Sequence, residues 1–429
     1  MPHVPPDEAR PLDLEQQKKR AKELTRDLAA GDAQAVARFR SRHPKARGLT
    51  DEQTRLRLAK VTEAQLVVAR ELGLPSWSRL REHITRHAEA RRAVAAGASV
   101  LDGEGPTTHV RCGSDIRDGL LRAGLTGTFL EFFDPYCQGP VPRDGDLLEI
   151  RSQFVASAYD LQLTAARDEL ATQLRALEAT TGRDRVVLWF EHDTFDQLIL
   201  ARILAFYAER GVPRRLELVQ VSRFPGLDRF RGLGELSAAA LRMLWDDRRP
   251  VDSARIALGA RTWEALREPS PTPLFELTRA SDASPEVGPA VLRHLQELPW
   301  RGDGLSLTER IALQLVAEGP RSAGEMFVGF GDRDTGTHLG LGDSMFYAIL
   351  RRLAAAPTAP VTIATGSRES PHRDVVTLSP AGRRLVAGDL DWLTTKPPER
   401  WVGGVRVAAG AAAWRWDPSA AAPVLGTPG

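Results

Sequence analysis

Between residues 106 and 225, short apolar segments typical of β-strands alternate with segments that have the spacing of amphipathic helices. The apolar segments have the sequences HVRC, GTFLEFF, RVVLWF and RLELVQV. A helix that connects two parallel strands must bury its apolar stripe against the sheet, so this alternation is typical of a parallel sheet covered by helices. We therefore predict an α/β fold with a mainly parallel sheet.

The chain has 429 residues, more than one hydrophobic core usually organises, and its sequence divides into four parts. Residues 1–95 have helical spacing and are predicted to form a helical module. Residues 106–225 form the predicted sheet domain, which we expect to be Rossmann-like. Residues 226–300 are a predicted helical connector. In residues 301–429 three helical segments precede a hairpin and a further helix, the succession of a winged helix, and a Gly/Ala-rich tail with tryptophans follows.

The composition, 42% hydrophobic and 27% charged, is ordinary for a soluble globular protein. Two cysteines give no disulfide framework, and no apolar stretch approaches the roughly 18 residues of a membrane span. We expect a cytoplasmic protein that does not enter a membrane. Residues 1–100 hold 20 Lys and Arg against 13 Asp and Glu, which suits an acidic partner such as nucleic acid. Solvated arginine-rich helix faces are the simpler explanation.

Polar side chains follow every predicted strand. In an open parallel sheet, ligands bind at the carboxyl ends of the strands, because loops and helix N-termini converge there. We therefore expect one candidate ligand-binding edge formed by Gly113, Ser114 and Asp115 after the first strand, Asp134 after the second, Glu191, His192 and Asp193 after the third with Asp196 and Gln197 one turn further on, and Ser222 and Arg223 after the fourth.

The third strand end carries the most distinctive chemistry. We expect His192 to act as a general acid or base, oriented by Glu191 or Asp193, because a neighbouring acid can adjust the pKa of an imidazole. An alternative is a divalent metal held by His192 with Asp193, Asp196 and Asp134. The structural alternative is helix capping, since Thr194 and Gln197 have capping-box spacing and the aspartates suit the positive end of a helix dipole.

The first strand end suits an anion, because Gly113 permits close backbone approach and a helix follows. An ordinary tight turn explains the same residues. The glycine-rich fingerprints of dinucleotide-binding and P-loop proteins are absent. The expected substrate is therefore a small polar molecule, phosphorylated or nucleotide-like, and the expected reaction is of the hydrolase or transferase type. His109 begins the first strand and is either a further substrate contact or a histidine of the core or of a subunit contact.

Two resemblances support this division. The segments HVRCGSD, FFDPYCQGPVP and LWFEHDTFDQ, with LTERIALQLVAEGP and WRWD nearer the C-terminus, resemble the bacterial family called domain of unknown function 1835 with its C-terminal companion domain. The resemblance covers roughly residues 107–417, and the family has Gly-Asp-Ser where this chain has Gly113, Ser114 and Asp115. It implies a fold and a site but no established reaction. The segment TEAQLVVARELGLPSWSRLREHI resembles the helical lead-in of bacterial ankyrin-repeat proteins, which implies a small docking module.

Two other functions remain open from the sequence. A ligand-sensing regulator would use the winged helix to bind DNA, but its candidate recognition helix, GDSMFYAILRRLAAA, carries only Arg351 and Arg352 as cations. DNA-reading helices usually present more cationic groups. Winged helices also serve as packing or dimerisation modules, which we favour here and which leaves a homodimer open. A non-catalytic scaffold fits the N-terminal module but not the polar groups at the strand ends.

Overall fold

The structure is a computed structural model that describes residues 11–279, 284–364, 370–410 and 412–426. The chain forms two compact units. Of these described residues, the first unit comprises 11–107, 114–129 and 218–249, and the second comprises 108–113, 130–217 and those from 250 to 426. In the part of the chain described, no helix has both the length and the apolar character needed to span a membrane.

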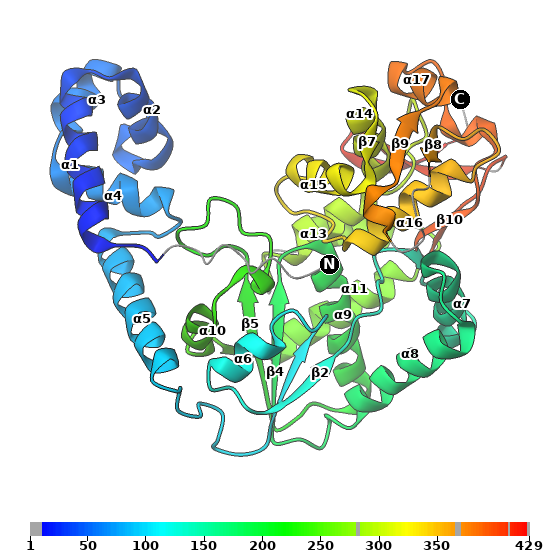
Figure 1. Cartoon of the computed structure of the whole chain (residues 1–429), viewed down its shortest axis with the longest axis horizontal. Helices are drawn as coiled ribbons and strands as arrows, with labels where there is room; N and C mark the ends of the chain where they lie inside the picture. The colour runs from blue at the N-terminus through cyan, green and yellow to red at the C-terminus, as the bar shows by residue number, and fades with distance from the viewer. Residues whose placement is uncertain (1–10, 280–283, 365–369, 411, 427–429) are drawn as a thin grey trace. The chain divides into compact units, whose positions relative to one another are not determined.

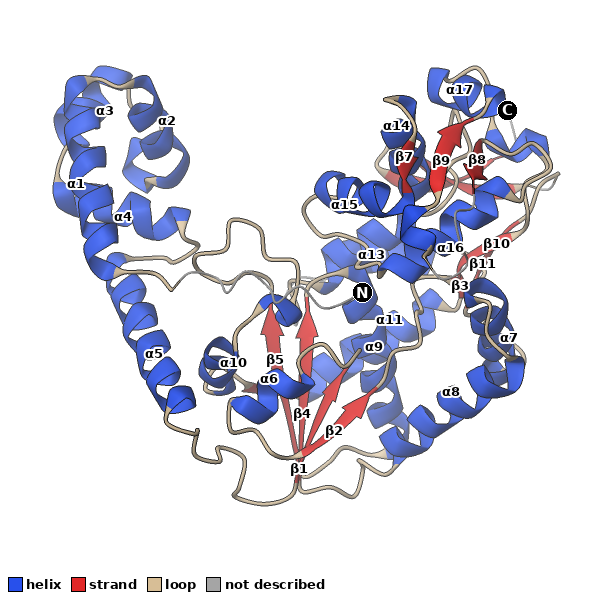
Figure 2. Ribbon diagram, viewed as in Figure 1, coloured by secondary structure: helices blue, strands red, loops and turns tan. Residues whose placement is uncertain are grey.

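The largest sheet is mainly parallel and confirms the predicted α/β class (Figure 2). Its strand order is β2-β1-β4-β5-β6. The strands are β1 (Thr107–Arg111), β2 (Thr128–Glu131), β4 (Arg185–Glu191), β5 (Arg215–Val221) and β6 (Arg249–Pro250). Every residue of β4 is buried, which explains its continuous apolar sequence: a central parallel strand is covered on both faces.

The first unit contains the N-terminal helices, which Figure 1 shows in blue. Its helices are α1 (Leu14–Ala30), α2 (Ala33–Arg42), η1 (Pro44–Ala46), α3 (Asp51–Leu58), α4 (Val61–Glu71), α5 (Trp77–Ala95), α6 (Arg117–Arg122), η2 (Leu233–Glu235) and α10 (Ala238–Trp245). Apolar side chains that recur at helical spacing, among them Leu24, Leu28, Phe39 and Val67, form the core between α1, α2 and α4.

The second unit holds the helices that position the candidate site. They are α7 (Leu147–Tyr159), α8 (Leu163–Glu178), α9 (Thr194–Arg210), α11 (Ser253–Leu266), α12 (Thr272–Glu276), η3 (Leu277–Arg279) and α13 (Val287–Leu295). Helix α9 is buried over most of its surface. Its close packing against α11 requires a glycine, because a Cβ atom on Gly259 would overlap the side chain of Leu204.

The same unit continues into a helical domain with a small antiparallel sheet of order β7-β9-β8. Its elements are α14 (Leu307–Ala317), β7 (Arg321–Ser322), α15 (Ala323–Arg333), α16 (Asp343–Ala354), β8 (Val361–Ala364), η4 (Pro371–Arg373), β9 (Val375–Leu378) and α17 (Pro380–Ala387). Phe330, Phe346, Leu350 and Val376 are buried in its core.

The C-terminal tail belongs to the second unit and packs within it. Its elements are η5 (Trp392–Thr395), β10 (Arg400–Gly403), β11 (Val405–Val407), β12 (Ala413–Asp417) and β13 (Ala422–Gly426). Strand β10 pairs in parallel with β3 (Gly139–Pro140). The backbone N–H of Trp416 donates to the carbonyl of Pro299 at 2.8 Å. The tail is therefore held against the segment before α14, where Trp416 also forms a parallel β-bridge with Trp300.

Candidate functional site

Helix α9 begins directly after the central strand β4 and is capped by Asp193. The Asp193 side chain is only 3% exposed, and its Oδ1 accepts a hydrogen bond from the backbone N–H of Asp196 at 2.9 Å. The capping-box interpretation of Thr194 is therefore wrong. Thr194 is the first helical residue, and its hydroxyl donates instead to the carbonyl of Ala290 at 3.0 Å.

Arg111, at the end of β1, holds two of the acidic side chains. Its Nη1 lies 2.5 Å from Asp196 Oδ2, and its Nη2 donates to Glu191 Oε1. Asp196 Oδ2 also accepts from the backbone N–H of Glu191 at 2.6 Å, and Asp196 Oδ1 accepts from the thiol of Cys112 at 2.8 Å. All four side chains are buried. Glu191 and Asp196 therefore form a buried ion-pair network that joins β1 to the β4–α9 junction.

Asp193 differs from its neighbours in its ionisation. Burial, and then the negative charge of Asp196, raise the pKa of the Asp193 carboxyl to about 7. A hydrogen bond to the Asp196 backbone, the positive charge of Arg111 and a hydrogen bond with the Glu191 side chain oppose this rise in the pKa. Asp193 is therefore a buried carboxyl group whose pKa is raised toward neutrality, a property typical of acid–base catalysts.

Glu191, Asp193 and Asp196 also form the group with metal-ligand spacing, since one oxygen of each lies within 4.8 Å of the others. Both oxygens of Asp196 already accept hydrogen bonds, and the Arg111 guanidinium supplies the positive charge beside them. A divalent ion would have to displace that guanidinium. The three carboxylates therefore fit the protein's own arginine better than a metal ion. Among the described residues, the group with metal-ligand spacing does not include His192 or Asp134, which were predicted as ligands.

A segment from the C-terminal part of the second unit covers the start of α9. The carbonyl of His338 accepts from the backbone N–H of Thr194 at 3.0 Å, and the carbonyl of Leu339 accepts from Phe195 at 3.1 Å. The rings of His192 and His338 meet edge to face, with centroids 5.4 Å apart. The two backbone donors that an external anion would use at this helix are therefore occupied by the chain itself.

Gly340 lies against the Asp193 carboxylate in a left-handed conformation, with φ +74°, and an added Cβ atom would overlap Asp193 Oδ1.

We expect Gly340→Ala to lower the free energy of unfolding by about 1–3 kcal/mol more than Gly336→Ala, because overpacking adds to the conformational strain. Gly336 is the matched control, since it has φ +79° and no atom lies within 4 Å of the position that its Cβ would take. Urea denaturation measures both; equal losses would mean that Gly340 does not press on Asp193.

The structure brings together only part of the predicted edge. Gln197 joins the cluster, since its Nε2 donates to the Glu191 carbonyl. Asp134 is instead paired with Arg151, whose Nη2 lies 2.6 Å from its Oδ1. His109 lies in the core, where its Nδ1 accepts from Trp189 Nε1 at 3.1 Å.

The first strand end is divided between the two units. Gly113 belongs to the second unit and is half-buried, whereas Ser114 and Asp115 belong to the first unit and are exposed. In the first unit Asp115 lies beside Gly234, where an added Cβ would be 2.9 Å from Asp115 Oδ2. At the fourth strand end, Ser222 and Arg223 are also exposed residues of the first unit.

Sequence reasoning missed three contributors: Arg111 as the partner of the acids, His338 and Gly340. An arginine at the end of a buried apolar strand was the available signal for Arg111, because a buried charge needs a partner. His338 and Gly340 gave no signal, since about 145 residues separate them from α9 and no local pattern links the two segments.

In comparisons with known proteins, the chain matches no family model and no curated protein, so the resemblance to the domain of unknown function 1835 stays a prediction.

Proposed function

We propose that the protein is an enzyme of the hydrolase or transferase type, acting on a small polar molecule that is phosphorylated or nucleotide-like. Asp193 is the proposed proton donor and acceptor. The observation that carries the proposal is the place of this carboxyl: it is only 3% exposed and stands at the end of the central strand of a mainly parallel sheet, where burial and the charge of Asp196 raise its pKa toward neutrality. Acid–base catalysis is most efficient when the pKa of the catalytic group lies near the working pH.

The neighbours of Asp193 fit supporting roles. Glu191 is held by Arg111 and hydrogen-bonds to Asp193, so it orients the carboxyl. His192 is half-buried beside His338, and we propose that it contacts substrate or relays a proton. The backbone of Gly340 lies against Asp193, so the segment His338–Gly340 has to move before a substrate reaches the carboxyl.

The order α14, β7, α15, α16, β8, β9 suits a winged helix, which we propose serves as a packing module. Its candidate recognition helix offers only two cations, Arg351 and Arg352, and both line a cavity within the second unit. Arg352 pairs with Glu309 at 2.8 Å, and Arg351 donates to the carbonyl of Ala158 at 3.2 Å. No specific observation therefore favours DNA binding over catalysis.

The test begins with the small molecules that copurify with the protein, released by denaturation and identified by mass spectrometry. If none is found, a panel of phosphate monoesters, phosphoanhydrides and nucleotides is screened for turnover. We expect Asp193→Asn to lower turnover about a hundredfold or more, because loss of a general acid–base costs at least this factor. Asp252→Asn is the control, since Asp252 caps α11 in the same way, with its Oδ1 accepting from Arg255 at 2.8 Å. Full turnover by Asp193→Asn would contradict the proposal.

A further inference from the structure

The second unit contains a cavity of about 490 Å³ that shares no residue with the acidic cluster. It is lined by the loop and strand around β3, by α7 and α16, and by β10. Its volume lies within the range typical of small-molecule sites. Two residues of the cavity wall also lie near the start of α9. The carbonyl of Leu339 accepts a hydrogen bond from the backbone N–H of Phe195. Cys137 is close enough to Asp193 that the aspartate charge, after burial, raises the pKa of the thiol.

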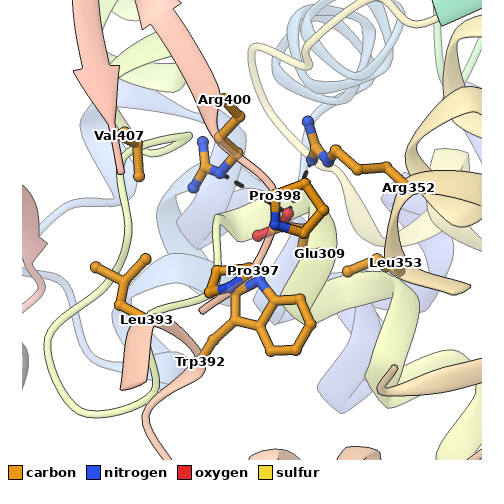
Figure 3. Close-up of a pocket in the computed structure, with 9 residues that line it drawn as sticks. All are labelled: Glu309, Arg352, Leu353, Trp392, Leu393, Pro397, Pro398, Arg400 and Val407. Atoms are coloured by element: carbon orange, nitrogen blue, oxygen red, sulfur yellow. Dashed lines mark hydrogen bonds and ion pairs between the residues drawn. The ribbon is translucent and has the colours of Figure 1, made fainter. Parts of the chain in front are cut away.

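The wall of this cavity is rich in arginine: Arg351, Arg352 and Arg400 all line it. Arg352 and Arg400 share one carboxylate, that of Glu309, which lies 2.8 Å from Arg352 Nη2 and 3.8 Å from Arg400 Nε. Figure 3 shows both guanidinium groups reaching toward Glu309. Arg351 has no carboxylate partner among the described residues, and it donates to the carbonyl of Ala158.

The two acidic residues of the wall, Glu297 and Glu399, offset only part of the charge of the three arginines. The Glu297 carboxylate is engaged by Arg293, at 2.7 Å, and Glu399 is engaged by Arg406. The cavity therefore has an excess of positive charge, and a buried Arg400 whose Nη2 has no hydrogen-bond partner within the described chain. The small hollow of Figure 3, about 10 Å³, holds at most about one water molecule, so a ligand would occupy the larger cavity beside it.

The cavity also offers an aromatic surface. Trp401 is half-buried in its wall, and the ring makes no aromatic or cation–π contact with the described residues. Its Nε1 donates to Glu399 at 3.2 Å, which fixes the ring. Gln138 lines the same space, and the chain holds both ends of its amide: Oε1 accepts from the Tyr159 hydroxyl at 2.8 Å, and Nε2 donates to the Met345 carbonyl at 3.4 Å. An indole ring that makes no aromatic contact with the described residues suits stacking by a planar ring.

We propose that this cavity binds a mononucleotide-like molecule, with a phosphate group at Arg351 and Arg352 and a planar base against Trp401. Guanidinium groups bind phosphate through charge-assisted hydrogen bonds, and the base adds stacking contacts. The inference names the substrate class of the proposed enzyme and rests on that function, because the cavity adjoins the residues that cover Asp193.

Isothermal titration calorimetry with AMP, GMP, CMP and UMP at low salt tests the inference without requiring turnover. We expect at least one nucleotide to bind with a Kd below about 1 mM, and its nucleoside to bind about tenfold or more weakly, since one charge-assisted contact is worth about this factor. Arg351→Ala and Trp401→Leu should each weaken binding about tenfold, and Trp401→Phe should restore part of the loss.

The control is Arg383→Ala. Like Arg351, Arg383 is exposed and donates to one backbone carbonyl, that of Leu378, but it does not line the cavity. Unchanged affinity is expected. Binding of none of the four nucleotides at about 10 mM, a concentration far above the Kd expected here, would overturn the inference, as would binding that Arg351→Ala and Trp401→Leu leave unchanged. If Arg351→Ala weakens binding while Asp193→Asn retains full turnover, the nucleotide site stands and the catalytic proposal fails. If Arg351→Ala binds nucleotides unchanged while Asp193→Asn loses turnover, the catalytic proposal stands and the nucleotide site fails.

Discussion

Replacing Arg111 with methionine is expected to lower the free energy of unfolding by about 3–5 kcal/mol, because it leaves two buried carboxylates without their positive partner. Glu191 and Asp196 are 3% and 1% exposed, and both bind the Arg111 guanidinium directly. Methionine keeps much of the apolar volume of the arginine side chain, so the loss reports charge rather than a cavity. Urea denaturation followed by circular dichroism measures it.

Two further variants identify the cause. The triple variant Arg111→Met, Glu191→Gln, Asp196→Asn removes all three charges, and we expect it to regain most of the lost stability, because neutral amides cost less to bury than unpaired carboxylates. Arg383→Ala removes an exposed arginine and should change stability by less than about 0.5 kcal/mol. A loss below about 1 kcal/mol for Arg111→Met would contradict the expectation that the variant leaves two unpaired buried charges.

Asp193→Asn is expected to become progressively more stable than the natural protein as the pH rises from about 4 to about 8. The ordinary pKa of an aspartate is 3.8, and burial raises that of Asp193 to about 7 in the folded protein. Between these values the folded protein keeps a proton that the unfolded chain loses, so unfolding becomes easier as the pH rises. At pH 8 the ionised carboxyl costs on the order of 4 kcal/mol, a cost that asparagine avoids while still capping α9.

The measurement is the difference in unfolding free energy between the two proteins at several pH values. Using the difference removes the effect of His294, whose buried imidazole has a pKa of about 4 and titrates in both proteins. Asp252→Asn, at the exposed cap of α11, should show no such trend. A difference that stays constant with pH, or that falls as the pH rises, would show that Asp193 does not hold its proton near neutrality.

The sheet could be predicted because its signals are local. The run RVVLWF is β4 within one residue, and RLELVQV coincides with β5, since each is a buried apolar segment bounded by polar residues. The edge strand β6 has two exposed residues, Arg249 and Pro250, and no periodicity to reveal it. The tail strands escaped prediction for a similar reason: β12 and β13 lie among glycine, alanine and proline, whose composition favours a linker.

The sequence by itself determined where the acidic residues stand: a central strand followed at once by a helix places Glu191, Asp193 and Asp196 at one junction. Only the tertiary structure decided their chemistry. Arg111 lies 80 residues from Glu191 along the chain, and Gly340 reaches Asp193 from another part of the second unit. Ion pairing and burial depend on such distant neighbours. Ion pairing makes Glu191 and Asp196 the partners of Arg111, and burial raises the pKa of Asp193 toward neutrality.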